Sequence, residues 1–178
     1  MKRYNGHITI REAAADDADQ LCRWWNDGQI MAHAGFPLGL GTTPEAIRQK
    51  IAEDDNHRHI ILYDSIPIGE INYRETGAGV CEIGIKICNA SMQNKGLGKL
   101  ILSMFLEALF DEYGYEKIIL DTNLNNLRAR HVYEQLGFRE IRIRENAWKD
   151  QLGELQSAVD YALTKDSFVS FTGIPILL

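Results

Sequence analysis

Residues 80–111 constrain the fold more than any other part of the chain, because a strand pattern, a glycine-rich loop and a helix pattern follow one another there. Ile83, Ile85 and Ile87 alternate with polar residues, which predicts a strand with one apolar face. Beyond the loop, apolar residues recur at three- and four-residue steps, which predicts an amphipathic helix. The stripe of that helix consists of Leu97, Leu100, Ile101, Met104, Phe105, Ala108 and Leu109.

The loop between these two elements has the composition of an anion-binding site. The first turn of a helix carries unpaired N–H groups and a partial positive charge, so it attracts phosphates. Gly96 and Gly98 allow a ligand to approach the backbone closely, and Lys95 and Lys99 add positive charge. The stretch QNKGLGK therefore predicts a cradle for a pyrophosphate.

Two common phosphate-binding motifs are excluded at this loop. A P-loop requires glycine where Gln93 stands, and serine or threonine where Leu100 stands. A dinucleotide-binding fingerprint requires a third glycine where Ile101 stands. From this loop alone, two interpretations stay open: an anion cradle of another kind, or a helix entry whose glycines allow tight packing.

The rest of the chain alternates strand and helix patterns in a single domain. We expect strands at 7–13, 57–64, 66–75, 80–88, 116–122, 138–146 and 155–164, and helices at 16–25, 42–53, 97–113 and 125–137. No repeat, low-complexity tract or linker interrupts the 178 residues. The domain prediction is one unit over 1–178, with a core at about 8–165 and an apolar C-terminal tail at 166–178.

The amino-acid composition argues against several classes of binding partner. A net charge of −6 argues against nucleic-acid binding, which depends on a basic face. The three cysteines lack the spacing of a disulfide framework or zinc site, and the histidines, including His57 and His59, suggest no metal site. No apolar run is long enough to span a membrane. We therefore expect a cytoplasmic protein that binds neither membrane nor metal.

A second motif follows the 116–122 strand, and with it the chain resembles the GNAT superfamily of N-acetyltransferases. The matching segments are QNKGLG and the pattern NxxAxxxYExxGF, formed by Asn126, Ala129, Tyr133, Glu134, Gly137 and Phe138. The segments around 10–27 and 66–73 resemble the branch that contains ribosomal-protein alanine and serine acetyltransferases. The resemblance extends over about residues 8–163.

The resemblance implies an α/β (α+β) fold with a mixed, V-splayed central sheet of about seven strands and about four helices. It implies that acetyl-CoA is the cosubstrate and binds where the strands at 80–88 and 116–122 part. Carried over residue by residue, the cofactor-binding positions are Ile87, Cys88, Gln93, Asn94, Lys95, Gly96, Leu97, Gly98, Lys99 and Asn126. Ile87 and Cys88 would pair with the pantetheine arm, and Asn126 would hydrogen-bond to it.

The implied chemistry is direct attack of an amine on the thioester. A free alkyl amine has a pKa of about 10.4, so a base must remove its proton. Glu82 is the first candidate for this base, with Glu70 in reserve and Asp160 as a weaker candidate. By the same resemblance, Tyr133 would point at the thioester sulfur and protonate the leaving thiolate.

The sequence leaves two classes of amine acceptor open. One is a protein N-terminus, and the other is a small amine such as an aminoglycoside, a polyamine or an amino acid. A non-catalytic CoA-binding or sensor module is the alternative outside enzymology. A homodimer is possible, with the apolar tail as one candidate contact.

Overall fold

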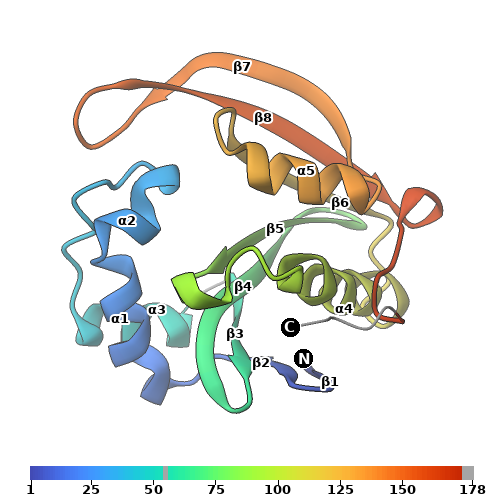
Figure 1. Cartoon of the computed structure of the whole chain (residues 1–178), viewed down its shortest axis with the longest axis horizontal. Helices are drawn as coiled ribbons and strands as arrows, with labels where there is room; N and C mark the ends of the chain where they lie inside the picture. Colours follow the sequence, from blue (N-terminus) through green and yellow to red (C-terminus); the bar gives the residue numbers. More distant parts are fainter. Residues whose placement is uncertain (54–55, 174–178) are drawn as a thin grey trace.

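Eight strands form one mixed sheet in the computed structural model, which describes residues 1–53 and 56–173. The order across the sheet is β1-β2-β3-β4-β5-β6-β8-β7 (Figure 1). The strands are β1 Lys2–Asn5, β2 Ile8–Glu12, β3 His57–Tyr63, β4 Ile66–Gly77, β5 Val80–Ile87, β6 Lys117–Asn123, β7 Arg139–Lys149 and β8 Leu155–Thr164.

Five α-helices and four short 3-10 turns accompany the sheet within the described ranges. The helices are α1 Ala18–Trp25, α2 Gly28–Met31, α3 Pro44–Glu53, α4 Leu97–Asp111 and α5 Leu127–Gln135. The 3-10 turns are η1 Ala15–Asp17, η2 Ala32–Ala34, η3 Ala90–Met92 and η4 Lys165–Ser167. The predicted fold class is confirmed, with one strand and one helix more than expected.

The two additional elements have local causes. β1 pairs with β2 through a two-residue turn, in which Gly6 has a φ of 58° and supplies the positive φ that tight hairpin turns need. The single turn of α2 is capped by Asp27, whose carboxylate accepts hydrogen bonds from the N–H groups of Gln29 and Ile30. The sequence signals for β1 and α2 are both short, and neither produces a periodic pattern of apolar residues.

The sheet parts in its middle, as expected. β5 and β6 run parallel and pair only over Val80–Glu82 and Lys117–Ile119. Beyond that point β5 remains paired with β4, while β6 pairs with β8 along its whole length. The sheet therefore consists of two halves that meet at one end and diverge at the other (Figure 1).

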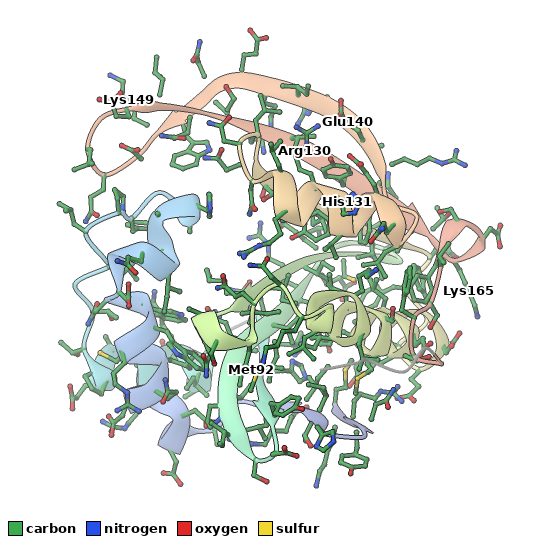
Figure 2. The ribbon with its side chains drawn as sticks, in the orientation of Figure 1. Met92, Arg130, His131, Glu140, Lys149 and Lys165 are labelled. Carbon is green, nitrogen blue, oxygen red and sulfur yellow. The ribbon has the colours of Figure 1, made fainter. Side chains whose placement is uncertain are left out.

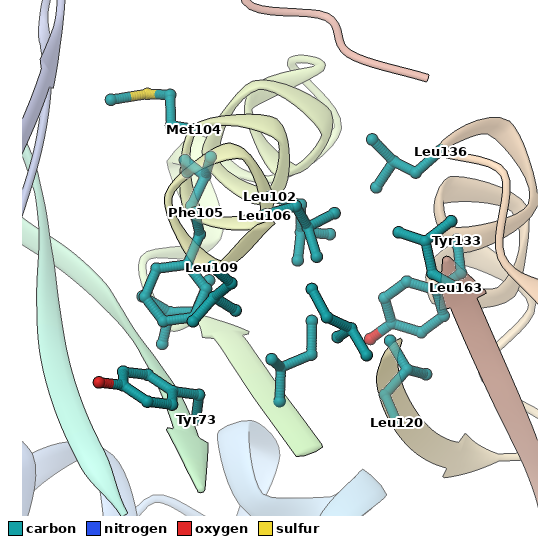
Figure 3. Packing of buried hydrophobic residues seen from close by; sticks show 14 of the residues in the cluster. Tyr73, Leu102, Met104, Phe105, Leu106, Leu109, Leu120, Tyr133, Leu136 and Leu163 are labelled. Atoms are coloured by element: carbon teal, nitrogen blue, oxygen red, sulfur yellow. The ribbon is translucent and has the colours of Figure 1, made fainter. Parts of the chain in front are cut away.

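Two apolar clusters cover opposite faces of the sheet. Ile61 packs in the larger cluster with α4 and α5, which also contains Tyr133 (Figure 3). Its neighbour Ile60 points to the other face and packs in a smaller cluster with α1 and α3. The period of two along β3 thus assigns alternate residues to the two clusters.

The first part of the C-terminal tail packs on the domain itself. The N–H of Phe171 donates to Ser103 Oγ on α4, and the ring of Phe171 lies under Lys99 Nζ at 4.7 Å. The end of the tail, 174–178, lies outside the described residues. No helix in the described ranges is long and apolar enough to cross a membrane.

Candidate functional site

A cleft of about 980 Å³ opens where β5 and β6 diverge. On the α4/α5 face it is lined by the loop before α4, the start of that helix and the inner side of α5. On the other face it is lined by polar residues of β4 and β5, by α2 and by Trp148 of β7. The gap in the sheet therefore connects two different environments, as a site for two substrates requires.

The loop and helix tip have the predicted cradle geometry. Gly96 precedes α4 with a φ of 74°, and no atom lies within 4 Å of the position where a Cβ would be. No side-chain oxygen caps the helix, so its first N–H groups stay available. Of the predicted cofactor residues in this segment, Gln93, Asn94, Gly96, Leu97, Gly98 and Lys99 line the cleft. Lys95 does not line it.

Arg128 joins the cradle from the opposite side of the gap, and sequence reasoning did not single it out. Its Nη1 donates to Gln93 Oε1 at 2.8 Å and to Asn94 Oδ1 at 3.5 Å. Gln93 in turn donates to the carbonyl of Ile87 at 2.8 Å, which ties the loop back to β5. The sequence signal for Arg128 is that it is a basic residue in the first turn of the helix that follows Asn126. Arg128 places a positive charge, held by neutral amides, beside the helix tip.

The position of Cys88 departs from the prediction. Ile87 lines the cleft, but Cys88 is buried in the smaller apolar cluster, and its N–H is bound to the carbonyl of Ile68 at 2.8 Å. Burial raises the pKa of its thiol to about 12. β5 ends at Ile87, and the chain then turns away from the gap, so its free edge faces the gap only over the residues between Glu82 and Cys88.

Asn126 and Tyr133 line the cleft from α5. Asn126 Oδ1 caps the helix by accepting from the N–H of Ala129 at 3.3 Å, and its amide nitrogen lies 3.4 Å from Thr122 Oγ1. Tyr133 is buried, and its hydroxyl makes no hydrogen bond with any described residue. Burial, together with the negative charge of Asp121, raises the pKa of Tyr133, so the phenol keeps its proton at neutral pH.

Glu82 lines the cleft from the other half of the sheet. It occupies the last residue pair between β5 and β6, where the gap begins. Its Oε2 accepts from Arg74 Nε at 2.7 Å, whereas its Oε1 makes no hydrogen bond within the described part of the chain. Lys86, which shares the face of Glu82 on β5, does not pair with it but turns to a different carboxylate.

That carboxylate is Glu70, and it does not line the cleft. It is 2% exposed, and it accepts hydrogen bonds from Trp25 Nε1 at 2.8 Å, Arg58 Nη1 at 2.5 Å and Lys86 Nζ at 3.2 Å. Asp160 is similarly occupied, by Arg142 and Arg144, and also lies outside the cleft lining. The reserve candidates for the base are therefore parts of ion-pair clusters.

The β7–β8 hairpin bridges the open end of the gap. Gln151 lies in the turn of this hairpin. Its backbone N–H donates to the carbonyl of Gly35, and its side-chain N–H donates to the carbonyl of Gly39. Its side-chain oxygen accepts a hydrogen bond from the N–H of Leu38. Trp148 leaves no room for a Cβ at Gly35, since its ring lies 2.4 Å from that position. Figure 1 shows the hairpin reaching from β8 toward α2, and Figure 2 marks Lys149 near its tip.

Comparisons with known proteins agree with this geometry. The domain described as "Acetyltransferase (GNAT) domain" matches residues 7–139. The aminoglycoside N(6')-acetyltransferase type 1 of Klebsiella pneumoniae is 28% identical over 150 residues, with 75% of each chain covered.

Two solved structures share the fold. The spermidine N-acetyltransferase from Vibrio cholerae in complex with CoA and spermine has a TM-score of 0.79 at 21% identity, covering 92% of this chain and 98% of that one. The ribosomal-protein-S5-alanine acetyltransferase from Vibrio fischeri has a TM-score of 0.74 at 14% identity, covering 95% and 99%.

Proposed function

The chain belongs to the GNAT acetyltransferase family, and we propose that it transfers the acetyl group of acetyl-CoA to a primary amine of a small molecule. The observation that carries this proposal is the cleft through the parted sheet. It joins an anion cradle on one face to a polar surface on the other, with Glu82 and Tyr133 on opposite sides of the opening.

The described residues fit acetyl-CoA in three respects. The uncapped tip of α4, with Gly96 and Arg128 beside it, suits a pyrophosphate. The edge of β5 beyond Glu82 has no partner strand among the described residues, which suits an extended amide-bearing arm such as pantetheine. Asn126 lies on the facing side of the same gap. Bound acetyl-CoA supplies the acetyl group as a thioester.

Glu82 and Tyr133 account for the proton movements. Glu82 takes a proton from the acceptor nitrogen, directly or through water, as that nitrogen bonds to the acetyl carbon. Tyr133 donates a hydrogen bond to the departing sulfur and then its proton, which it recovers from solvent. The raised pKa of Tyr133 ensures that this hydroxyl is protonated before the reaction.

A small acceptor is favoured over a protein N-terminus by the hairpin bridge. Gln151 and Trp148 connect the hairpin to the segment 35–39 across the acceptor side of the cleft. An approaching polypeptide would have to pass this connection, whereas a small amine would not. The aminoglycoside acetyltransferase relative points to the same class of acceptor.

The experiment measures CoA release with an aminoglycoside, spermidine, an amino acid and an N-terminal peptide as acceptors. We expect turnover with a small amine, a fall in kcat of about 100-fold in Glu82→Gln with a displaced acid limb of the pH–rate profile, and slower turnover in Tyr133→Phe with unchanged acetyl-CoA affinity. Tyr4→Phe, at an exposed position of β1, is the matched control.

Three outcomes would contradict the proposal. Acetyl-CoA binding without turnover of any acceptor would indicate a CoA-binding module instead. Turnover of the peptide alone would move the acceptor to a protein N-terminus. Wild-type rates in both variants would remove Glu82 and Tyr133 from the mechanism.

A further inference from the structure

Asn72 is a polar side chain that lines the cleft. Its neighbours on β4, Ile71 and Tyr73, are buried in the larger apolar cluster, so Asn72 points to the opposite face. The side-chain amide of Asn72 makes no hydrogen bond with any residue in the described ranges. An amide has two donors and one acceptor oxygen to satisfy, so this group is available to a ligand.

Gly84 gives this amide its place at the opening of the sheet. Asn72 and Gly84 are opposite each other in the β4–β5 register, and Asn72 Oδ1 lies 2.9 Å from the position of a Cβ on Gly84. Gly84 is two residues beyond Glu82, where the pairing with β6 ends. Glycine at this position therefore lets the amide lie over the strand, next to the proposed base.

Among the described residues, every carboxylate that lines the cleft around Asn72 has an arginine partner. The two described carboxylates that line the cleft are Glu82 and Asp121, and each is bound by an arginine, Arg74 and Arg144 respectively. A polyamine presents only N–H donors in its protonated form and would leave the NH₂ of Asn72 unsatisfied. A hydroxyl group both accepts and donates, so it matches the amide.

We propose that Asn72 positions the acceptor by hydrogen-bonding to an oxygen next to the reactive amine. The preferred acceptor is then a hydroxylated amine of the amino-sugar type, and polyamines such as spermidine are poor substrates. This inference rests on the proposed acetyl transfer and specifies its substrate class. Asn72 is half-buried, and a bound acceptor without a matching oxygen would cover its amide without pairing it, which costs free energy and disfavours that acceptor.

The test compares three acceptors in wild type and Asn72→Ala by CoA release. They are an aminoglycoside, its deoxy analogue lacking the hydroxyl beside the reactive amine, and spermidine. We expect Asn72→Ala to lower kcat/KM for the hydroxylated amine by about tenfold, and to change it less than twofold for the other two. Asn72→Asp keeps the shape but loses the donors, so it lowers the ratio of aminoglycoside to spermidine turnover.

Thr76→Ala is the matched control, because it lies on the same strand but outside the cleft lining. Acetyl-CoA affinity and the melting temperature check that the Asn72 variants fold. Equal losses on all three acceptors, or none, would overturn the assignment of Asn72 while acetyl transfer still stands. Wild-type preference for spermidine would also overturn it, whereas no turnover of any amine would remove the proposed function as well.

Discussion

The ion-pair cluster around Glu70 should be the most sensitive polar position in the fold. Glu70 is 2% exposed and holds Arg58, Lys86 and the indole N–H of Trp25. The substitution Glu70→Gln keeps the size of the side chain and an oxygen for Trp25, but removes the negative charge. Arg58 and Lys86 then remain beside a neutral amide.

The expected loss is about 3 kcal/mol of unfolding free energy. Removing one member of a buried ion pair typically costs about 3–5 kcal/mol. The side chain of Arg58 is only 14% exposed and would stay beside the neutral amide, whereas that of Lys86 is 34% exposed and can turn to water. Because one of the two cations can regain solvent, the expected cost lies at the low end of this range. For a chain of this size, about 3 kcal/mol corresponds to a decrease in melting temperature of about 6–12 °C.

The pH dependence supplies an independent check. Burial alone would raise the pKa of Glu70, but the charges of Lys86 and Arg58 and the hydrogen bond from Trp25 outweigh it and lower the pKa. The stabilisation is therefore complete above the ordinary value of 4.5 and is lost as the pH falls through the lower folded-state pKa. The difference between wild type and Glu70→Gln should shrink accordingly in acid.

Urea unfolding at pH 7 and in acid, with thermal melting alongside, measures both effects. Lys86→Met is the companion variant, because it removes the more exposed cation and should cost less than Glu70→Gln. A loss below about 1 kcal/mol at pH 7, or a difference that grows in acid, would refute the reasoning. If Glu70→Gln had normal stability but lost the acid limb of the pH–rate profile, Glu70 would be a candidate for the catalytic base.

Two further predictions concern the cradle. Arg128→Gln should weaken CoA binding by about tenfold and make the binding less sensitive to salt, as measured by calorimetry at two ionic strengths. An unchanged Kd would show that the guanidinium of Arg128 only stabilises the loop and does not contact CoA. Gly96→Ala has space for the methyl group but forces alanine to a φ of 74°, so it should cost about 1–2 kcal/mol in stability, and an unchanged melting temperature would show that the loop relaxes freely.

Local patterns were enough to predict most elements of the fold, because period and turn chemistry are properties of neighbouring residues. β8 was predicted with its observed bounds, Leu155–Thr164, and the apolar stripe that predicted a helix after the loop lies in α4. The cleft was predicted through the resemblance, and it does contain Glu82 and Tyr133.

The partners of the site residues could not be predicted in the same way. Trp25 and Glu70 are 45 positions apart in the sequence, and their hydrogen bond depends on how α1 packs against the sheet. Arg74 faces Glu82 only because of the β4–β5 register. The sequence around Asn72 carries no signal of its own, because its place over a glycine at the gap depends on that same register.

The bridge made by Gln151 means that the separation of the two sheet halves is fixed at both ends. At one end, three residue pairs join β5 to β6. At the other end, a single turn clasps the segment around Gly35 and Gly39. Glu82 and Tyr133 belong to different halves, so the length of that distant turn sets how far apart they stand. Insertions at 150–154 would therefore change the distance between these two proposed reacting groups.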